Sequence, residues 1–600
     1  IYTLSLHDAL PIYELGAVYL VSESNNRNTK LNLENVSFDG NNRAVKGENI
    51  IIEASGKMNF TNNTFSGAGG AVFLSDKSGA DFKNGTMIFS GNRADGDSGR
   101  GGAIYAHGSE SGISFMSSAV TFSNNTAGGA GGAAALYDSS VFSAKDSIFA
   151  FQENISAQGG ALYAANNSVL EFTNSMLKFD KNKSISAGGG AVYLEFAGAK
   201  FTGGMVQAYE NQALSGGFGG FLYIKNRNIG FENATVHIAS NTASAGGGIY
   251  SSGAAGVSFR SSDVLFEYNI AGGTDAVRSG GAIYSYNSEY NFNASAVSFL
   301  DNKSENGSGG AIYANNTRMT FTGSTVSFTS NIIESGNGSG GAISLLADAA
   351  GKSKMDFINS GIVFSGNAVT QGWGGAISFS TADINFTGGK DIAFYDNSAL
   401  AGRGGAVYAG GGASMNFSGS ENVTFAGNKA ASGGAIYADA DSLIKFSNVE
   451  KLAFSGNCVS GSGGAIYLQN ASSADFSATA LTAAGNKSEN GSGGFLYTES
   501  SDQTGFGAVI LISNTAKTDG GAIAAGRAAK LLFSGTDSDI SYNKAGRNGG
   551  AVSLAAGASA AFSGDSFKAS GNSAYNGGFL YCDGARDRKS TRLNSSHTNL

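Results

Sequence analysis

The sequence is poor in cysteine, proline, histidine and charged side chains. Its 600 residues include 2 cysteines, 1 proline and 4 histidines, and Asp, Glu, Lys and Arg together account for 14%. Cys458 and Cys582 are far apart and form no C-x-x-C pair, which favours two isolated buried thiols over a disulfide. The chain has no run of roughly 18 apolar residues, so it offers no candidate for a membrane-spanning helix. The mild formal charge of −8 argues against nucleic acid as a partner.

Both ends of the chain depart from the rest of the sequence. Residues 1–12 (IYTLSLHDALPI) and 587–600 (DRKSTRLNSSHTNL) are similar to translated sequencing-adapter sequence. We therefore predict artefacts in these two segments and set them aside from fold reasoning. They contain the single proline, Pro11, and two of the 4 histidines, so that the body of the chain retains His107 and His237.

Glycine, by contrast, is abundant, with 91 residues, and it recurs in a Gly-Gly-Ala-Ile-Tyr-like phrase. Full copies of the phrase begin at Gly101, Gly280, Gly309, Gly433 and Gly463. Counted by the second glycine, 18 copies run from Gly70 to Gly578 at a mean spacing of about 30 residues. Such a period is typical of a solenoid, in which stacked units share one continuous core.

One unit, residues 309–340, shows how a single turn of the solenoid is built. It contains three strand-like runs, Ala311–Ala314, Arg318–Phe321 and Thr325–Phe328, each bounded by Asn, Thr, Gly or Ser. Apolar residues alternate with polar ones in each run, and no run of ten or more residues has the 3.6-residue period of a helix. We predict an all-β fold, a right-handed parallel β-helix solenoid with about 30 residues and three short strands per coil.

A second motif, Phe-x-x-Asn, accompanies the glycine phrase. We interpret Phe as a stacked core residue and Asn as a corner residue, because Asn tolerates left-handed turns and its amide can donate and accept hydrogen bonds at once. Stacked in register, these amides would form a ladder. The motif occurs at Phe38/Asn41, Phe89/Asn92, Phe122/Asn125, Phe151/Asn154, Phe179/Asn182, Phe266/Asn269, Phe299/Asn302, Phe328/Asn331, Phe364/Asn367, Phe394/Asn397, Phe425/Asn428 and Phe454/Asn457, and Asn alone remains at Asn241, Asn486, Asn514, Asn543 and Asn572.

The paired motifs resemble the repeat of the chlamydial polymorphic outer-membrane proteins, and the resemblance covers nearly all of residues 16–582. It implies an autotransporter, with a signal peptide, a surface-exposed β-helix passenger and a C-terminal β-barrel that anchors the passenger in the outer membrane. It also implies an adhesin that binds host cells. On this basis we interpret residues 13–586 as a single β-helix passenger domain, and we expect the barrel domain to be absent from this fragment.

The tyrosine of the glycine phrase is the predicted surface site. Alternation turns Ile312 inward and Tyr313 outward, and the tyrosine slot also accepts Ser, so we expect these rings to be exposed in a stripe. The stripe comprises Tyr105, Tyr163, Tyr193, Tyr223, Tyr250, Tyr284, Tyr313, Tyr408, Tyr437, Tyr467 and Tyr497. Exposed aromatic rows can stack on sugars or on side chains of a partner. The alternative is that the rings only stabilise the stacking of coils.

No catalytic, cofactor-binding or metal-binding residues are predicted. His107 and His237 lie in no recurrent polar cluster, and we expect them to be solvated or locally hydrogen-bonded. Asp95, Asp97 and Asp275 lie in longer segments between strands, where solvated turns are favoured over a Ca²⁺ site.

The sequence therefore predicts a non-enzymatic adhesin at the bacterial cell surface, with a host-cell receptor or glycan as its partner. Two alternatives remain open. A secreted β-helix lyase or hydrolase of acidic polysaccharides would group Asp with Lys or Arg on one exposed patch, and a structural surface coat would need no specific partner.

Overall fold

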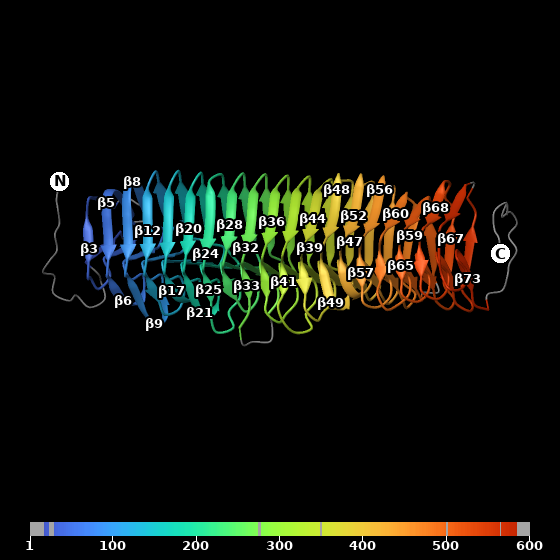
Figure 1. Cartoon of the computed structure of the whole chain (residues 1–600). Coiled ribbons are helices and arrows are strands. Elements are labelled where there is room, and N and C mark those ends of the chain that lie inside the picture. Colours follow the sequence, from blue (N-terminus) through green and yellow to red (C-terminus); the bar gives the residue numbers. More distant parts are fainter. Residues whose placement is uncertain are drawn as a thin grey trace. The chain divides into compact units, whose positions relative to one another are not determined.

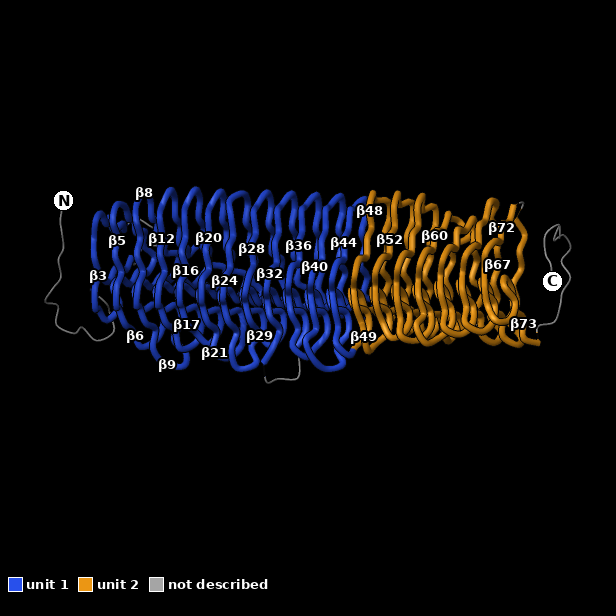
Figure 2. The backbone as a smooth tube through the Cα atoms, in the orientation of Figure 1, with its two compact units in different colours: residues 1–371 blue, residues 372–600 orange. Residues whose placement is uncertain are grey.

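The chain folds as a parallel β-solenoid with about 29 residues per turn. The computed structural model describes residues 17–22, 29–273, 278–348, 351–499, 502–564 and 566–584. In these ranges the regular elements are strands, arranged in three parallel sheets that we name A, B and C (Figure 1). The described ranges contain no helix of the length and apolarity needed to cross a membrane. The chain divides into two compact units, residues 1–371 and 372–600 (Figure 2).

In the first unit, one coil consists of β38 (Ile312–Asn315), β39 (Arg318–Thr322), β40 (Thr325–Thr329) and β41 (Ile332–Ile333). The three predicted strands are confirmed, and the two-residue strand β41 is a fourth that the sequence did not predict. Strand β38 belongs to sheet A, β39 and β40 to sheet B, and β41 to sheet C. Each strand pairs in parallel with the equivalent strand of the next coil, so equivalent side chains stack directly upon one another.

The core consists of the inward-facing residues of these strands. In the coil just described, Ile312, Phe321 and Phe328 are each 0% exposed. Phe328 stacks on Phe299 of the preceding coil and on Phe364 of the following one, with ring centroids 4.7 and 4.9 Å apart and planes nearly parallel. The predicted role of the motif phenylalanines as stacked core residues is thus confirmed. Burial of such rings also explains why the alternation is so regular, since a one-residue slip would expose every ring.

The predicted asparagine ladder is present. Asn302 is fully buried, and its Nδ2 donates to Asn331 Oδ1 (3.0 Å) and to the Phe266 carbonyl (2.9 Å). The backbone N–H of Asn302 also donates to Asn331 Oδ1. In the first unit the ladder runs from Asn41 to Asn367, and its rungs include Asn63 and Asn211, which the motif did not assign. In the second unit, ladder asparagines are hydrogen-bonded in the same way from Asn397 to Asn572.

The left-handed residue of this corner is not the ladder asparagine but the residue before it. Glu153, Lys181 and Asp301 precede Asn154, Asn182 and Asn302 and have φ of 53, 55 and 51°. The asparagines are therefore not selected for tolerance of a left-handed turn, and that part of the prediction is wrong. They are selected for an amide that can donate and accept inside the core.

The second unit repeats the same architecture. Its sheet A includes β46 (Ile377–Ser380), β50 (Val407–Gly410), β54 (Ile436–Ala438), β58 (Ile466–Leu468) and β62 (Leu496–Thr498). Phenylalanine rings again stack along the core, as between Phe386 and Phe417, whose centroids are 4.6 Å apart. Cys458 and Cys582 form no disulfide in the described part of the chain, but Cys458 is only partly buried and Cys582 is exposed, so the prediction of two buried thiols is wrong.

Candidate functional site

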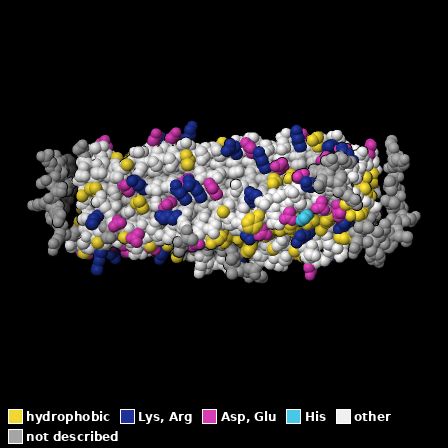
Figure 3. All heavy atoms as spheres, turned by 180° about the vertical axis from the view of Figure 1, so that it is seen from behind, with side chains coloured by type: hydrophobic (Ala, Val, Ile, Leu, Met, Phe, Trp, Pro, Cys, Tyr) yellow, Lys and Arg dark blue, Asp and Glu magenta, His cyan; other side chains and the backbone are white. Residues whose placement is uncertain are grey.

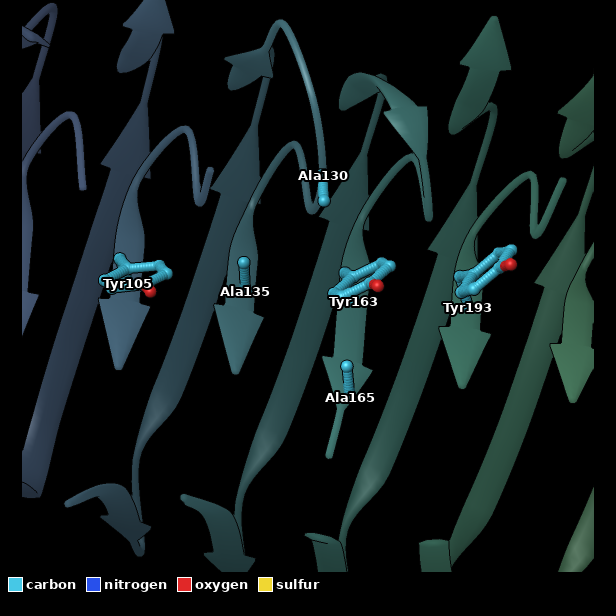
Figure 4. Packing of buried hydrophobic residues seen from close by; sticks show 6 residues of the cluster. All are labelled: Tyr105, Ala130, Ala135, Tyr163, Ala165 and Tyr193. Atoms are coloured by element: carbon cyan, nitrogen blue, oxygen red, sulfur yellow. The ribbon is translucent and has the colours of Figure 1, made fainter. Parts of the chain in front are cut away.

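The tyrosines of the glycine phrase form a column on the outer side of sheet A. Tyr105 lies on β10 (Ile104–His107), Tyr163 on β18 (Leu162–Ala165) and Tyr193 on β22 (Val192–Glu195), and their rings project from the same side of the sheet (Figure 4). Tyr193 stacks on Tyr163 and on Tyr223, with centroids 5.3 and 4.4 Å apart. The predicted column therefore exists as a continuous aromatic stack in this part of the first unit.

One coil departs from the pattern and shows that the stack itself is maintained. Ala135 occupies the tyrosine slot between Tyr105 and Tyr163. Tyr137, two residues later on the same face of β14 (Ala134–Tyr137), fills the gap, with its ring 5.8 Å from Tyr105 and 5.2 Å from Tyr163. The stack continues through Tyr250, Tyr284 and Tyr313 in the first unit, and a separate stack joins Tyr408, Tyr437, Tyr467 and Tyr497 in the second.

The column is less exposed than the sequence predicted. Tyr105, Tyr163, Tyr193, Tyr408 and Tyr437 are 6, 5, 6, 8 and 2% exposed. The other members of the predicted stripe are partly exposed, namely Tyr223, Tyr250, Tyr284, Tyr313, Tyr467 and Tyr497. Two features cover the rings. Each ring stacks on a neighbouring ring, and the segment that returns to sheet A places Ala130 against the rings (Figure 4). Ala68 also packs against this cluster. The expectation of an open aromatic stripe is therefore wrong for the buried members.

Burial of the column also affects its ionisation. Desolvation raises the pKa of Tyr250 and of Tyr467 to about 12, and neighbouring acidic groups, Tyr223 and Glu499 respectively, add to the effect. The pKa of Tyr105 and of Tyr163 is raised for the same first reason. The phenols therefore stay neutral at physiological pH. Their apolar rings stack in the column, and their hydroxyl groups can form hydrogen bonds.

The two histidines of the body are locally bonded, as expected. His107 Nε2 lies 2.8 Å from Asp138 Oδ2. His237 lies between two partners, with Nδ1 2.9 Å from the Tyr209 hydroxyl and Nε2 3.0 Å from Glu267 Oε2. These three side chains come from β24 (Met205–Tyr209), β28 (Thr235–Ala239) and β32 (Asp263–Glu267) and could pass a proton along the chain. None of them lines the groove described below.

The acidic turn residues do not assemble a metal site in the described part of the chain. Asp95 lies on β9 (Arg93–Arg100) and forms an ion pair with Arg93. Among the described residues no three His, Cys, Asp or Glu side chains are placed to hold one ion. Asp275 lies outside the described residues.

A groove of about 570 Å³ on the outer side of sheet B is the concave feature that the sequence did not predict. It crosses four successive coils of the first unit at the starts of β27 (Asn228–Glu232), β31 (Gly256–Arg260), β35 (Glu289–Asn293) and β39 (Arg318–Thr322). Its lining is mostly polar and includes Asn228, Ser258, Glu289, Asn291, Arg318 and Lys352. Only three-dimensional stacking brings these residues together, since the motifs say nothing about outward-facing positions.

On the face seen in Figure 3, backbone and uncharged polar side chains cover most of the surface. Figure 3 shows one face, on which Lys, Arg, Asp and Glu side chains form small scattered clusters and hydrophobic side chains gather mainly along its lower part. One charged cluster adjoins the groove, where Asp356 Oδ1 is 3.1 Å from Lys354 Nζ and Asp356 Oδ2 is 3.5 Å from Arg318. This is the grouping of Asp with Lys and Arg that a polysaccharide-degrading enzyme would need, although Asp356 itself is only 5% exposed.

Comparison with known families identifies the repeat. The model of the Chlamydia polymorphic membrane protein repeat matches residues 86–107, 296–315, 422–439 and 451–469. Each match runs from the second strand of sheet B, through a ladder asparagine, to the strand of sheet A that carries the tyrosine slot. The chain is thus a parallel β-helix protein with polymorphic membrane protein repeats, and the predicted resemblance is confirmed at these four places. No curated protein and no solved structure gives a significant match to the chain.

Proposed function

We propose that this chain is the surface-exposed passenger of an autotransporter and that it acts as an adhesin. The observation that carries the proposal is the presence of polymorphic membrane protein repeats in both β-solenoid units of the chain. Proteins with this repeat are generally non-enzymatic surface proteins. A solenoid suits adhesion because its length comes from repetition, while its outward-facing residues can vary without disturbing the core.

The outer surface supports a binding role rather than a purely structural one. Inward positions are restricted to a few residue types by stacking, whereas outward positions of sheet B range from Gly230 to Lys200 in neighbouring coils. Variation at such positions changes what the surface recognises at little cost in stability. The groove across β27, β31, β35 and β39 is a product of that variation.

The adhesive role is tested by coating beads with the purified chain and measuring attachment to cultured epithelial cells. We expect saturable attachment that excess soluble chain competes away, with albumin-coated beads as the background control. Attachment no greater than that background, or attachment that soluble chain does not reduce, would contradict the proposal.

The enzyme alternative has one observation in its favour, the cluster of Arg318, Lys354 and Asp356 beside the groove. Incubation of the chain with pectins and glycosaminoglycans, followed by absorbance of unsaturated uronides and by a reducing-sugar assay, tests it directly. We expect no turnover with the non-enzymatic adhesin. Turnover that is lost in an Asp356→Asn variant would favour the lyase or hydrolase instead.

A contribution of the tyrosine column to adhesion is confined, in our proposal, to its partly exposed members. Replacing Tyr284 and Tyr313 by Ser removes two ring edges that a partner could contact. We expect weaker cell attachment than with a control in which the buried Tyr163 is replaced by Ser. Equal attachment by the two variants would leave the column with a packing role only.

A further inference from the structure

The floor of the groove includes two small outward-facing residues of one coil, Gly256 and Ser258 on β31. On the preceding strand β27, Gly256 is in register with Asn228 and Ser258 is in register with Gly230. A Cβ atom at Gly256 would lie 2.6 Å from Asn228 Oδ1, so the asparagine amide leans over the space that the glycine leaves. Longer side chains follow at the same two positions in the next coil, namely Glu289 and Asn291. The longer side chains of Glu289 and Asn291 therefore rise beside the small residues and form a boundary of the hollow.

The side of the groove is positively charged. Arg318, on β39, has a side chain that is 59% exposed, and its carboxylate partner Asp356 is 3.5 Å away, farther than in an ordinary charge-assisted hydrogen bond. Lys352 is exposed and forms no ion pair with any described residue. The one carboxylate in the lining, Glu289, accepts a hydrogen bond from Asn291 Nδ2 at 3.1 Å. Two cations thus face the groove against one acid that already has a partner.

The remaining lining supplies hydrogen-bond donors and acceptors without a large apolar patch. Asn228, Asn291 and Ser258 present amide and hydroxyl groups that can each donate and accept. Vicinal sugar hydroxyls match such groups, and a carboxylate or sulfate matches a guanidinium and an ammonium. A peptide ligand would need pockets for apolar side chains or a free strand edge, and this face of the sheet offers neither because its strands are already paired on both sides.

The spacing of the coils provides a further match. Neighbouring parallel strands are about 4.8 Å apart, so four coils span roughly 14 Å. One coil therefore advances by about the length of one pyranose residue in an extended polysaccharide. A saccharide lying across the strands would meet an equivalent outward-facing position at each successive sugar.

We propose that this groove binds an anionic oligosaccharide, with its acidic group against Arg318 and Lys352 and its sugar hydroxyls on Asn228, Ser258 and Asn291. The inference rests on the proposed surface-binding function and names the ligand class for it. The shared chemistry is a pyranose chain that carries carboxylate or sulfate, and the test separates the two sources of charge.

The test is calorimetric titration of the purified full chain with size-matched hexasaccharides. A hyaluronan hexasaccharide carries carboxylates alone, a heparin hexasaccharide carries sulfates as well, and maltohexaose is neutral. We expect saturable binding of at least one anionic hexasaccharide that weakens as salt is added, and no binding of maltohexaose. Binding of hyaluronan and heparin alike assigns carboxylate recognition, and binding of heparin alone assigns sulfate recognition.

Two variants of different kinds place the ligand in the groove. Arg318→Gln combined with Lys352→Gln removes the cations, and Ser258→Tyr fills the floor at an exposed strand position where an aromatic residue is well tolerated. Each should weaken binding by about tenfold or more, the first because charge-assisted hydrogen bonds are lost and the second because the tyrosine ring occupies the space of the ligand. The control is Lys445→Gln on β55 (Leu443–Ser447), an exposed lysine on the outer side of sheet B in the second unit, which should bind within about twofold of the unaltered chain.

The proposal is overturned if no anionic hexasaccharide binds, if maltohexaose binds equally well, or if Lys445→Gln weakens binding as much as the groove variants do. Its failure is separable from that of the proposed function. Cells that still adhere to chain-coated beads when the groove binds no saccharide would leave the adhesin standing without this ligand. If the groove binds saccharide but the chain does not attach to cells, the ligand assignment stands and the adhesin proposal fails.

Discussion

Each ladder asparagine uses both polar atoms of its amide inside the core. The Oδ1 of Asn302 accepts from the Nδ2 and from the backbone N–H of Asn269, and its own Nδ2 donates twice. No other side chain of this size can replace that pattern. Aspartate would bring a charge and no donor, and leucine would leave the neighbouring groups unpaired.

Replacing Asn302 by Ala should therefore destabilise its coil by about 3–5 kcal/mol, because buried donors and acceptors on Asn269, Asn331 and Phe266 lose their partner. The measurement is the denaturation midpoint together with hydrogen exchange in peptides from residues 266–331. The matched control is Asn293→Ala at an exposed position, where we expect a change within about 0.5 kcal/mol. Equal effects of the two variants would remove the ladder as a source of stability.

The left-handed corner residue before each ladder asparagine gives a second prediction. Substitutions at two such corners should change stability in opposite directions. Glu153 has φ of 53° and is exposed, so Glu153→Gly should stabilise the chain by up to about 1 kcal/mol through relief of left-handed strain. Gly456 has φ of 61° with open space where a Cβ would lie, so Gly456→Ala should cost about 1 kcal/mol from strain alone. Melting temperatures of the two variants test the pair. Shifts in the same direction would show that φ does not control this corner.

For single residues, the repeat predicts the packing of inward-facing side chains but not the surroundings of outward-facing ones. The Phe and Asn columns could be predicted because every coil repeats the same steric and hydrogen-bonding demand. The burial of Tyr105 and Tyr163 could not, because tolerance of Ser in the slot suggested solvent, whereas the rings are covered by one another and by alanines of a returning segment.

Among the elements, sheet A is distinguished by an aromatic stack on its outer side in addition to the core on its inner side. Stacked rings are expected to contribute about 0.5–1.5 kcal/mol per pair beyond the area they bury. Tyr137 restores the stack where Ala135 interrupts it, which supports a packing function for the column. The sheet thus has apolar contacts on both faces along much of the first unit.

The stack predicts how stability depends on alkaline pH. The pKa of Tyr250 and of Tyr467 is raised by burial from 10.0 to about 12, so between these values the unfolded chain loses phenolic protons that the folded chain keeps. The stabilising contribution is complete below pH 10 and is lost as the pH rises toward 12. Denaturation midpoints at pH 8, 10 and 11.5 should fall mainly in the last interval. A constant midpoint across that interval would contradict the burial of the column.

The elements also show where local patterns stop being sufficient. The three longer strands follow from alternation and turn residues, as in β38, β39 and β40. Strand β41 has only two residues, too few for alternation to be visible, and it exists because the neighbouring coils hold it in register. The groove could not be predicted from local patterns either. Gly256, Glu289 and Arg318 are far apart in the sequence and become neighbours only when the coils are stacked.

For the molecule as a whole, stability within each unit comes from the repetition of one interface between adjacent coils. A single coil cannot stand alone, because the burial of its few apolar side chains does not offset the entropy of ordering its backbone. Family resemblance and fold could be read from the repeat for this reason. Ligand specificity could not, because it depends on outward residues that the stacking leaves unconstrained.

The most direct test of the account is a disulfide between equivalent residues of adjacent coils. Ser298 and Ser327 are in register on β36 (Ala296–Leu300) and β40, with hydroxyl oxygens 2.9 Å apart. In a chain whose Cys458 and Cys582 are replaced by Ser, a Ser298→Cys/Ser327→Cys pair should oxidise to a link detected by peptide mapping, since Cα atoms about 4.8 Å apart suit a disulfide. Ser298→Cys with Val363→Cys, two coils apart and roughly 10 Å distant, should stay reduced. Failure of the first pair to link, or equal linking of the second, would contradict the stacked-coil structure on which the account depends.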